Sequence, residues 1–235
     1  MLGQKLLWDR LIVALDLDNQ PEIEKAVKAL APKKVKFKVG SIALTKFGPD
    51  LVKKFIKQKI DVFLDLKLYD IPHTMEETAA VITEMGCWAF TVHIRAGSQA
   101  LGAVKERVER LAKADNLRKP LILGVTELTS SSVTRQEVLA LAEKAYHAGI
   151  DGVIASAKEA AAIKQKFGGK LKVVTPGIRN PNDEAGDQKR VTTAEVAFRS
   201  GADYIVVGRP IISNKDYLAA AQAILKFAHV GGSYE

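Results

Sequence analysis

Short apolar runs alternate with longer amphipathic segments along almost the whole chain. The longer segments, such as PEIEKAVKALA and TRQEVLALAEKAYHAG, repeat apolar residues at the three- and four-residue spacing of a helix. Strand then helix, repeated, predicts parallel strands. Eight such units in 235 residues predict an α/β fold, a single-domain (β/α)8 TIM barrel, a class that often has about 250 residues. The apolar runs are LIVALDL (11–17), VKFKVG (35–40), VFLDLKL (62–68), AFTVHI (89–94), LILGVTEL (121–128), GVIAS (152–156), KVVTPG (172–177) and YIVVGR (204–209).

Nothing in the sequence interrupts this alternation, so we expect one catalytic barrel domain over residues 1–235. With 47% hydrophobic and 26% charged residues, the chain is typical of a soluble globular protein, and no apolar run approaches the ~18 residues of a membrane span. Asp9, Arg10 and Asp16 interrupt the apolar N-terminal stretch, which argues against a signal peptide. Cys87 is the only cysteine, so we expect no internal disulfide and a cytoplasmic protein.

The net charge of +8 raises the question of nucleic-acid binding. Lysines such as Lys53 and Lys54 lie on predicted helix faces or just before a strand, without interleaved aromatic residues or a nucleic-acid-binding motif. We therefore expect a small anionic substrate as the partner, and neither nucleic acid nor a membrane.

Polar residues stand at the carboxyl ends of nearly all the predicted strands. In a parallel barrel these ends meet at one rim, which holds the active site. Within FLDLKLYDIPHT (63–74), Asp65 and Lys67 share parity, so alternation predicts that both point into the barrel mouth. Asp70 lies beyond the strand on a turn and need not face the same cavity. The rim residues are Asp16, Lys38, Asp65, Lys67, His93, Thr126 to Thr129, Arg179 and Arg209.

Each of these features also has a purely structural interpretation. The charges of Asp65 and Lys67 would then form an ion pair at the sheet end, but buried pairs often stabilise no more than apolar residues do. VVGRPI places Gly208 and Arg209 just after the last strand, where barrels often bind phosphate. Glycine lets the backbone approach an oxyanion, and arginine offers forked donors. A surface salt bridge of Arg209 is the alternative.

Six segments from Leu11 to Arg209 together resemble the bacterial type of the orotidine 5'-phosphate decarboxylase family. They are LIVALDLDN, FKVG, FLDLKLYDIPHT, GVTELTS, TPGIR and ADYIVVGRPI, in the family's order and at similar spacing. The resemblance implies an enzyme without cofactor or metal, a carboxy-lyase that converts orotidine 5'-monophosphate to UMP in de novo pyrimidine biosynthesis. It also implies a homodimer of barrels.

The resemblance further implies roles for individual residues. Lys67 would be the general acid at C6 of the pyrimidine, set between Asp65 and Asp70, with Lys38 in the same charged network. The implied substrate contacts are Asp16 and Lys38 to the ribose, Thr129 and Ser130 to the pyrimidine, Arg179, Gln188, Gly208 and Arg209 to the phosphate, and Ile71 and Thr74 of the neighbouring subunit, which also supplies Asp70.

Three positions depart from the common bacterial pattern. Tyr69 stands where His or Phe is frequent, His73 where Asn is usual, and Asn180 where Pro often follows the arginine. These departures concern the loops after the third and seventh predicted strands and leave the charged residues in place.

A lysine between two carboxylates suits the chemistry of this reaction. Loss of CO2 from C6 leaves an electron pair with no adjacent carbonyl to absorb it, so a positive group must stand close and then deliver a proton. Two carboxylates favour the protonated form of Lys67, as a general acid requires. A Schiff-base aldolase needs a neutral amine instead, so the same arrangement disfavours that alternative.

Other functional classes remain as alternatives. Metal-dependent keto-gulonate-phosphate decarboxylases and hexulose-phosphate synthases resemble the chain at the third strand but carry glutamate where Lys38 stands, and a lysine disfavours Mg2+. A non-catalytic phosphate-binding protein would gain little from a lysine between two acids. The four histidines do not pair with acids as metal ligands would. We expect His93 to face the interior as a hydrogen-bonded residue, either in the core or behind the residues of the site. We expect Ser132 or Thr134 to cap the next helix.

Overall fold

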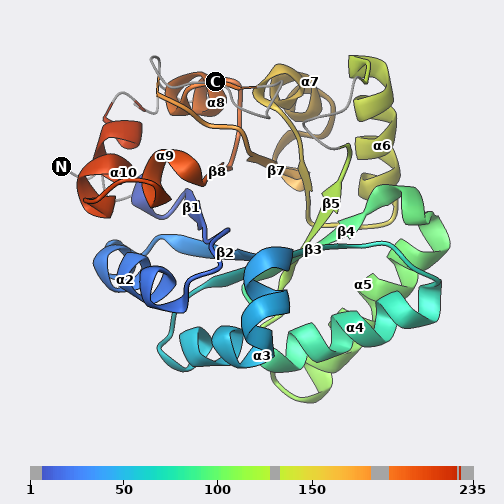
Figure 1. Ribbon diagram of the computed structural model, residues 1–235. Coiled ribbons are helices and arrows are strands. Elements are labelled where there is room, and N and C mark those ends of the chain that lie inside the picture. The colour runs from blue at the N-terminus through green and yellow to red at the C-terminus, as the bar shows by residue number, and fades with distance from the viewer. Residues whose placement is uncertain (1–6, 128–132, 181–190, 227, 229–235) are drawn as a thin grey trace.

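The computed structural model is a closed barrel of parallel strands with helices around it (Figure 1). It describes residues 7–127, 133–180, 191–226 and 228. Within these residues, eight strands pair in chain order and the last pairs with the first. The predicted (β/α)8 barrel is therefore confirmed. The strands are β1 (Leu11–Ala14), β2 (Lys36–Gly40), β3 (Val62–Leu68), β4 (Ala89–His93), β5 (Leu121–Val125), β6 (Gly152–Ile154), β7 (Lys172–Thr175) and β8 (Tyr204–Val207).

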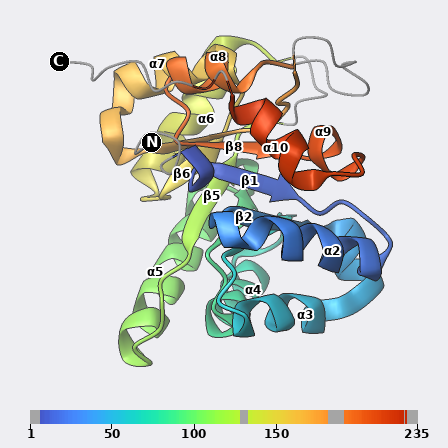
Figure 2. The same ribbon diagram turned by 90° about the vertical axis from the view of Figure 1, so that its left-hand side faces the viewer.

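Helices connect the strands and form the outer ring that Figure 1 shows. The short helix α9 follows β8 directly and lies against β1, as the side view in Figure 2 shows. None of the helices in the described residues is both long and apolar enough to cross a membrane. The helices are α2 (Gln20–Leu30), α3 (Ser41–Lys57), α4 (Pro72–Met85), α5 (Ser98–Ala114), α6 (Arg135–His147), α7 (Ala157–Phe167), α8 (Ala194–Arg199), α9 (Arg209–Ile212) and α10 (Tyr217–Leu225), with 3-10 turns η1 (Ala31–Lys33), η2 (Ile94–Ala96) and η3 (Gly168–Lys170).

Every predicted strand is present, but most end a few residues before the apolar run does. The run predicted over 121–128 is a strand only to Val125. The helix expected near residue 133 begins at Arg135 after Thr134. Thr134 and Glu137 form a reciprocal capping box there, so the expected cap is confirmed at Thr134.

Alternation along the strands sorts the apolar residues into two layers. In β1, Leu11 and Val13 belong to the large cluster that packs with residues of the surrounding helices. Ile12 and Ala14 belong to the smaller cluster inside the barrel. Because successive side chains of a strand point to opposite faces, one short sequence fills both layers. The inner cluster consists of Ile12, Ala14, Phe63, Trp88, Ala89, Leu123, Val174 and Val206.

A buried lysine lies at the amino-terminal end of the barrel interior. Lys36 is 7% exposed and donates to the carbonyl oxygen of Asp9 at 2.7 Å. Its ammonium lies 5.1 Å from the ring centroid of Trp88 and 5.5 Å from that of Tyr204, within the range of cation–π attraction. Burial lowers the pKa of Lys36, and the carboxylates of Asp61 and Asp9 only partly oppose this.

Two glycine substitutions test how tightly this barrel is packed. A Cβ on Gly152 in β6 would lie 2.8 Å from the carbonyl oxygen of Lys172, so Gly152→Ala should destabilise the protein by about 1–3 kcal/mol. A Cβ on Gly102 in α5 would meet nothing within 4 Å, so Gly102→Ala should stabilise by about 0.5–1 kcal/mol. Urea unfolding of both variants measures this. Equal stability of Gly152→Ala and the wild type would contradict the packing described.

Candidate active site

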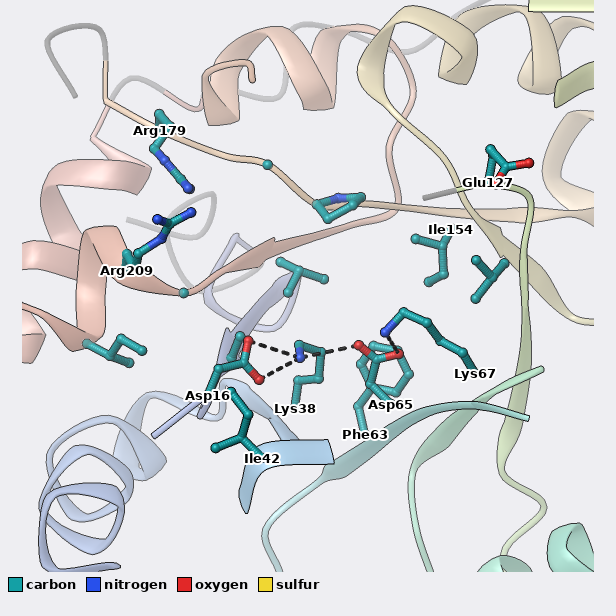
Figure 3. Close-up of a pocket in the computed structure, with 17 residues that line it drawn as sticks. Asp16, Lys38, Ile42, Phe63, Asp65, Lys67, Glu127, Ile154, Arg179 and Arg209 are labelled. Atoms are coloured by element: carbon teal, nitrogen blue, oxygen red, sulfur yellow. Dashed lines mark hydrogen bonds and ion pairs between the residues drawn. The ribbon is translucent and has the colours of Figure 1, made fainter. Parts of the chain in front are cut away.

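A cavity of about 480 Å³ opens among the carboxyl ends of the strands (Figure 3). Apolar side chains that include Ala14, Phe63 and Val206 line it next to the inner core. Charged side chains line the rest, which is the setting expected of a site for a polar ligand. The charged lining residues among those described are Asp16, Lys38, Asp65, Lys67, Glu127, Arg179 and Arg209.

Four of these side chains, Asp16, Lys38, Asp65 and Lys67, form a row of alternating sign, here called the charged row. The Lys38 ammonium lies 2.9 Å from Oδ1 of Asp16 and 3.2 Å from Oδ2 of Asp65. The other oxygen of Asp65, Oδ1, accepts from the Lys67 ammonium at 3.0 Å. The row therefore joins β1, β2 and β3 at the barrel mouth, as the dashed lines in Figure 3 show.

Burial makes the pairing within the charged row strong. Burial alone would raise the pKa of Asp65, but Lys38, Lys67 and hydrogen bonds from Lys67 and Thr91 outweigh it and lower that pKa. Burial alone would lower the pKa of Lys38, but Asp65 and Asp16 outweigh it and raise that pKa. Lys38 and Asp65 thus hold each other in the charged form.

Gly40 leaves room for the charged row, a role that the sequence analysis missed. A Cβ on Gly40, the last residue of β2, would lie 2.9 Å from Oδ1 of Asp16 and 3.2 Å from the Lys38 ammonium. Any other residue would push on the ion pair. The signal lay in FKVG, where a glycine follows the lysine by two residues, but glycine at a strand end has many other causes.

The end of β3 is irregular, which corrects the reasoning from simple alternation. The pairing of β3 with β4 shifts between Leu64 and Leu68, and Lys67 has a φ of 52°, a left-handed conformation that residues other than glycine rarely adopt. Asp65 and Lys67 both line the cavity as expected, although the pairing of this part of β3 with β4 is not a regular ladder. The buried hydroxyl of Thr91, also missed from the sequence, contacts both residues.

Two arginines lie at the other end of the cavity from Lys67, as Figure 3 shows. Arg179 follows β7, is 7% exposed, and donates to the carbonyl oxygen of Ile178 at 2.8 Å. Arg209 begins α9 directly after Gly208, the N-cap residue. A Cβ on Gly208 would meet only Ala14, at an ordinary 3.6 Å. Packing in the described chain therefore does not require glycine at position 208.

The structure does not bring Asp70, Ile71 or Thr74 into the cavity of their own chain. All three are exposed. The Asp70 carboxylate accepts from the backbone N–H of Ile71 at 2.7 Å. Among the described residues, the structure therefore gives the Lys67 ammonium one carboxylate partner, Asp65, rather than the two expected. Thr129, Ser130 and Gln188 lie outside the described residues, as does part of the segment from Thr126 to Thr129.

A second polar group borders the cavity beside Lys67. Glu127, whose side chain is 16% exposed, pairs with Arg95 at 2.7 Å. His93 stacks on Tyr69 at 5.2 Å between ring centroids and accepts from the backbone N–H of Arg95. His93 is thus hydrogen-bonded, as expected, but it lies at the rim rather than in the core. Glu127 falls within the predicted rim segment from Thr126 to Thr129, but its sequence context gave no separate role to the carboxylate.

Comparisons with known proteins agree with one another. The model of the orotidine 5'-phosphate decarboxylase / HUMPS family matches residues 9–224. The orotidine 5'-phosphate decarboxylase of Vibrio cholerae is 41% identical over 213 residues, 86% of this chain and 90% of that protein. The Coxiella burnetii enzyme of that name is 37% identical over 228 residues, 92% and 95% of the two chains. The crystal structure of the Lactobacillus acidophilus enzyme has a TM-score of 0.81 at 36% identity, covering 93% of this chain and 98% of its own.

The lowered pKa of Asp65 predicts how its contribution to stability depends on pH. That contribution is complete above the unfolded-state pKa of about 3.9 and is lost as pH falls through the lower folded-state pKa. We expect wild type to exceed Asp65→Asn in free energy of unfolding by about 1–3 kcal/mol at pH 7, with the difference shrinking below pH ~4. Asp18→Asn, at a side chain 77% exposed, is the control. If urea unfolding shows that the difference in free energy of unfolding between wild type and Asp65→Asn stays constant down to pH ~3, the linkage is contradicted.

Proposed function

Because this chain belongs to the orotidine 5'-phosphate decarboxylase / HUMPS family, we propose that the charged row is its catalytic centre and Lys67 its general acid. The protein decarboxylates orotidine 5'-monophosphate to UMP, a carboxy-lyase reaction of pyrimidine biosynthesis. Its partner is therefore a small anionic nucleotide, as the sequence predicts. The observation that carries the mechanism is the Lys67 ammonium, held by Asp65 at 3.0 Å in the cavity wall.

In the proposed step, the bond between C6 and the carboxylate breaks and its electron pair stays on C6 as CO2 leaves. The Lys67 ammonium stabilises this pair and then transfers a proton to C6, which becomes the C6–H of UMP. Solvent returns a proton to the neutral amine. Because the charged groups are already oriented, little reorganisation is needed when charge develops at C6.

Asp65 contributes to the step in two ways on this proposal. It holds the Lys67 ammonium in place at 3.0 Å, and it lies near the substrate carboxylate. Two unit charges ~4 Å apart repel by about 4 kcal/mol at an effective dielectric near 20. This repulsion disappears as the carboxylate becomes neutral CO2, so it favours the transition state over the bound substrate.

The layout of the cavity supports one orientation of the nucleotide. Arg179 and Arg209 lie at one end and would take the phosphate, with the open backbone at Gly208 beside them. The carboxylate of Asp16 and the ammonium of Lys38 lie between this end and Lys67, where the ribose hydroxyls would fall. Gln188 would complete the phosphate site, and Thr129 and Ser130 would contact the pyrimidine.

We further propose that the site is completed in a homodimer, in which Asp70, Ile71 and Thr74 reach the neighbouring cavity. Asp70 is exposed, although the proposed chemistry asks for a second carboxylate near Lys67. Apolar side chains surround it on the surface: Tyr69 is 64% exposed and Ile71 is 65% exposed. Such exposed apolar groups next to a functional acid are typical of an interface.

We place this enzyme in the cytoplasm as part of the same proposal. Cys87, the only cysteine of the sequence, is buried. Burial raises the pKa of its thiol to about 12, so it stays protonated and unreactive at neutral pH. Among the described residues, neither the fold nor the proposed reaction requires an oxidising compartment.

The decisive assay follows the fall in absorbance as orotidine 5'-monophosphate becomes UMP, with and without EDTA. We expect turnover that survives the chelator, because Asp16 and Asp65 hold the ammonium of Lys38 where a divalent cation would need their oxygens. Lys67→Ala should lose at least about ten-thousandfold in kcat, since proton transfer and electrostatic stabilisation each contribute about a hundredfold or more. Loss of activity in EDTA, restored by Mg2+, would instead favour the metal-dependent relatives.

The proposed dimer predicts complementation between two damaged chains. Lys67→Ala and Asp70→Ala would each be nearly inactive alone. If every site takes Lys67 from one subunit and Asp70 from the other, a hybrid dimer has one intact site. Equal mixing makes half of the dimers hybrid, so about a quarter of wild-type activity should return on co-expression, as two-fold symmetry requires.

Differently tagged chains confirm that hybrids have formed in this experiment. A mixture of Lys67→Ala with Asp65→Ala is the matched control, because both residues belong to one chain's cavity, and its hybrids should stay inactive. Hybrid dimers of the first pair that form in the expected proportion but remain inactive would place Asp70 in its own subunit's site.

A further inference from the structure

The bulge in β3 leaves several residues opposite one residue of β4. Leu64 pairs with Phe90, and the next pairing joins Leu68 to Val92. The segment from Asp65 to Lys67 therefore lies opposite Thr91 alone. In such a bulge the regular ladder is interrupted, and backbone groups must find other partners.

The Thr91 hydroxyl takes the place of the missing ladder contacts. Its oxygen accepts from the backbone N–H of Lys67 at 2.8 Å. The same hydroxyl donates to Oδ1 of Asp65 at 3.0 Å. Since Oδ1 also accepts from the Lys67 ammonium at 3.0 Å, the three residues close a ring of hydrogen bonds. A hydroxyl is both donor and acceptor, so one side chain can serve both neighbours.

We propose that Thr91 is a positioning residue of the decarboxylase, which holds the Lys67 backbone in its left-handed conformation and orients the Asp65 carboxylate. The proposal rests on the roles given above to Lys67 and Asp65. Thr91 itself does not line the cavity, so it acts on the reaction only through these two residues.

Burial makes the hydroxyl difficult to replace. Thr91 is 0% exposed, so no water molecule can reach the Lys67 N–H to replace the hydroxyl as its acceptor. Without the hydroxyl, the Lys67 N–H loses its partner inside the protein, and a buried N–H without an acceptor is costly. The left-handed φ of 52° at Lys67 is then maintained by one hydrogen bond fewer. The expected result is a Lys67 ammonium that is still present but no longer held in one place.

Asp65 would also change its titration on losing this contact. It is faced by Lys38 from β2, by Lys67 on its own strand and by Thr91 from β4, with Asp16 beyond Lys38. The Thr91 hydrogen bond is one of the contacts that lower the pKa of Asp65, after the larger effects of Lys38 and Lys67. Removing it therefore raises that pKa without abolishing the pairing.

Three variants test the proposal in the full-length enzyme, with kcat and KM for orotidine 5'-monophosphate measured across pH. Thr91→Val keeps the shape and removes the hydroxyl, whereas Thr91→Ser keeps the hydroxyl. Thr83→Val is the matched control, because Thr83 is equally buried but its hydroxyl donates to the Ala79 carbonyl within α4. It reports what losing a buried threonine hydroxyl does by itself.

We expect Thr91→Val to lose about 10- to 100-fold in kcat, the effect of losing a hydrogen bond to a charged group, with KM changed by less than about threefold. The acid limb of its kcat profile should move to higher pH. Thr91→Ser should stay within about threefold of wild type in kcat and keep the wild-type profile. Thr83→Val should keep wild-type kcat and profile even where its melting temperature falls.

A Thr91→Val enzyme with wild-type kcat and pH profile would overturn the proposal. So would a Thr91→Ser enzyme that loses about 10- to 100-fold in kcat. This second outcome also decides the matter if Thr91→Val does not fold. The proposed function has separate readouts: it fails if wild type does not turn over the nucleotide or if Lys67→Ala stays active. If Lys67→Ala loses activity while Thr91→Val keeps full activity, the proposed role of Thr91 is rejected and the proposed function is not.

Discussion

The Lys38 ammonium is the charge on which the arrangement of the barrel mouth depends. It is 9% exposed, and an isolated ammonium in such a place would be strongly destabilising. Asp16, just after β1, and Asp65 from β3 must therefore flank it, and Gly40 must carry no side chain that would displace them. Asp65 uses Oδ2 for the Lys38 ammonium, and its other oxygen, Oδ1, accepts from the Lys67 ammonium and so holds it in place. One buried charge thus sets residues on three strands.

Two lysines of β2 show how neighbours decide the protonation of the same side chain. Lys36 and Lys38 point into the barrel two residues apart, and both are buried. Burial lowers the pKa of Lys36, which has aromatic rings and a carbonyl oxygen around it. The pKa of Lys38 is raised in spite of burial, because carboxylates lie on both sides of it. At one end of the barrel interior, the aromatic rings of Trp88 and Tyr204 therefore surround a lysine. At the other end, carboxylates pair with one.

The sequence predicts what depends on local pattern and misses what depends on contacts across strands. The eight strands and the Thr134 cap follow from periodicity and capping chemistry. The bulge at Lys67 does not, because the residue that accepts from the Lys67 N–H there, Thr91, is distant in sequence but adjacent in space. The same holds for Gly40, whose importance is visible only beside Asp16. The direction of Asp70 depends on the turn geometry after β3, which parity alone leaves open.

Charge balance gives the proposed dimer a consequence beyond shape. Within one chain the charged row is neutral, with two carboxylates and two ammonium groups. Adding Asp70 from a neighbour would make it net negative and would increase the repulsion on the substrate carboxylate. Product UMP lacks that carboxylate and escapes the repulsion. Since each ligand would contact both subunits, ligand binding and dimer formation must stabilise one another, and more strongly with UMP than with the substrate.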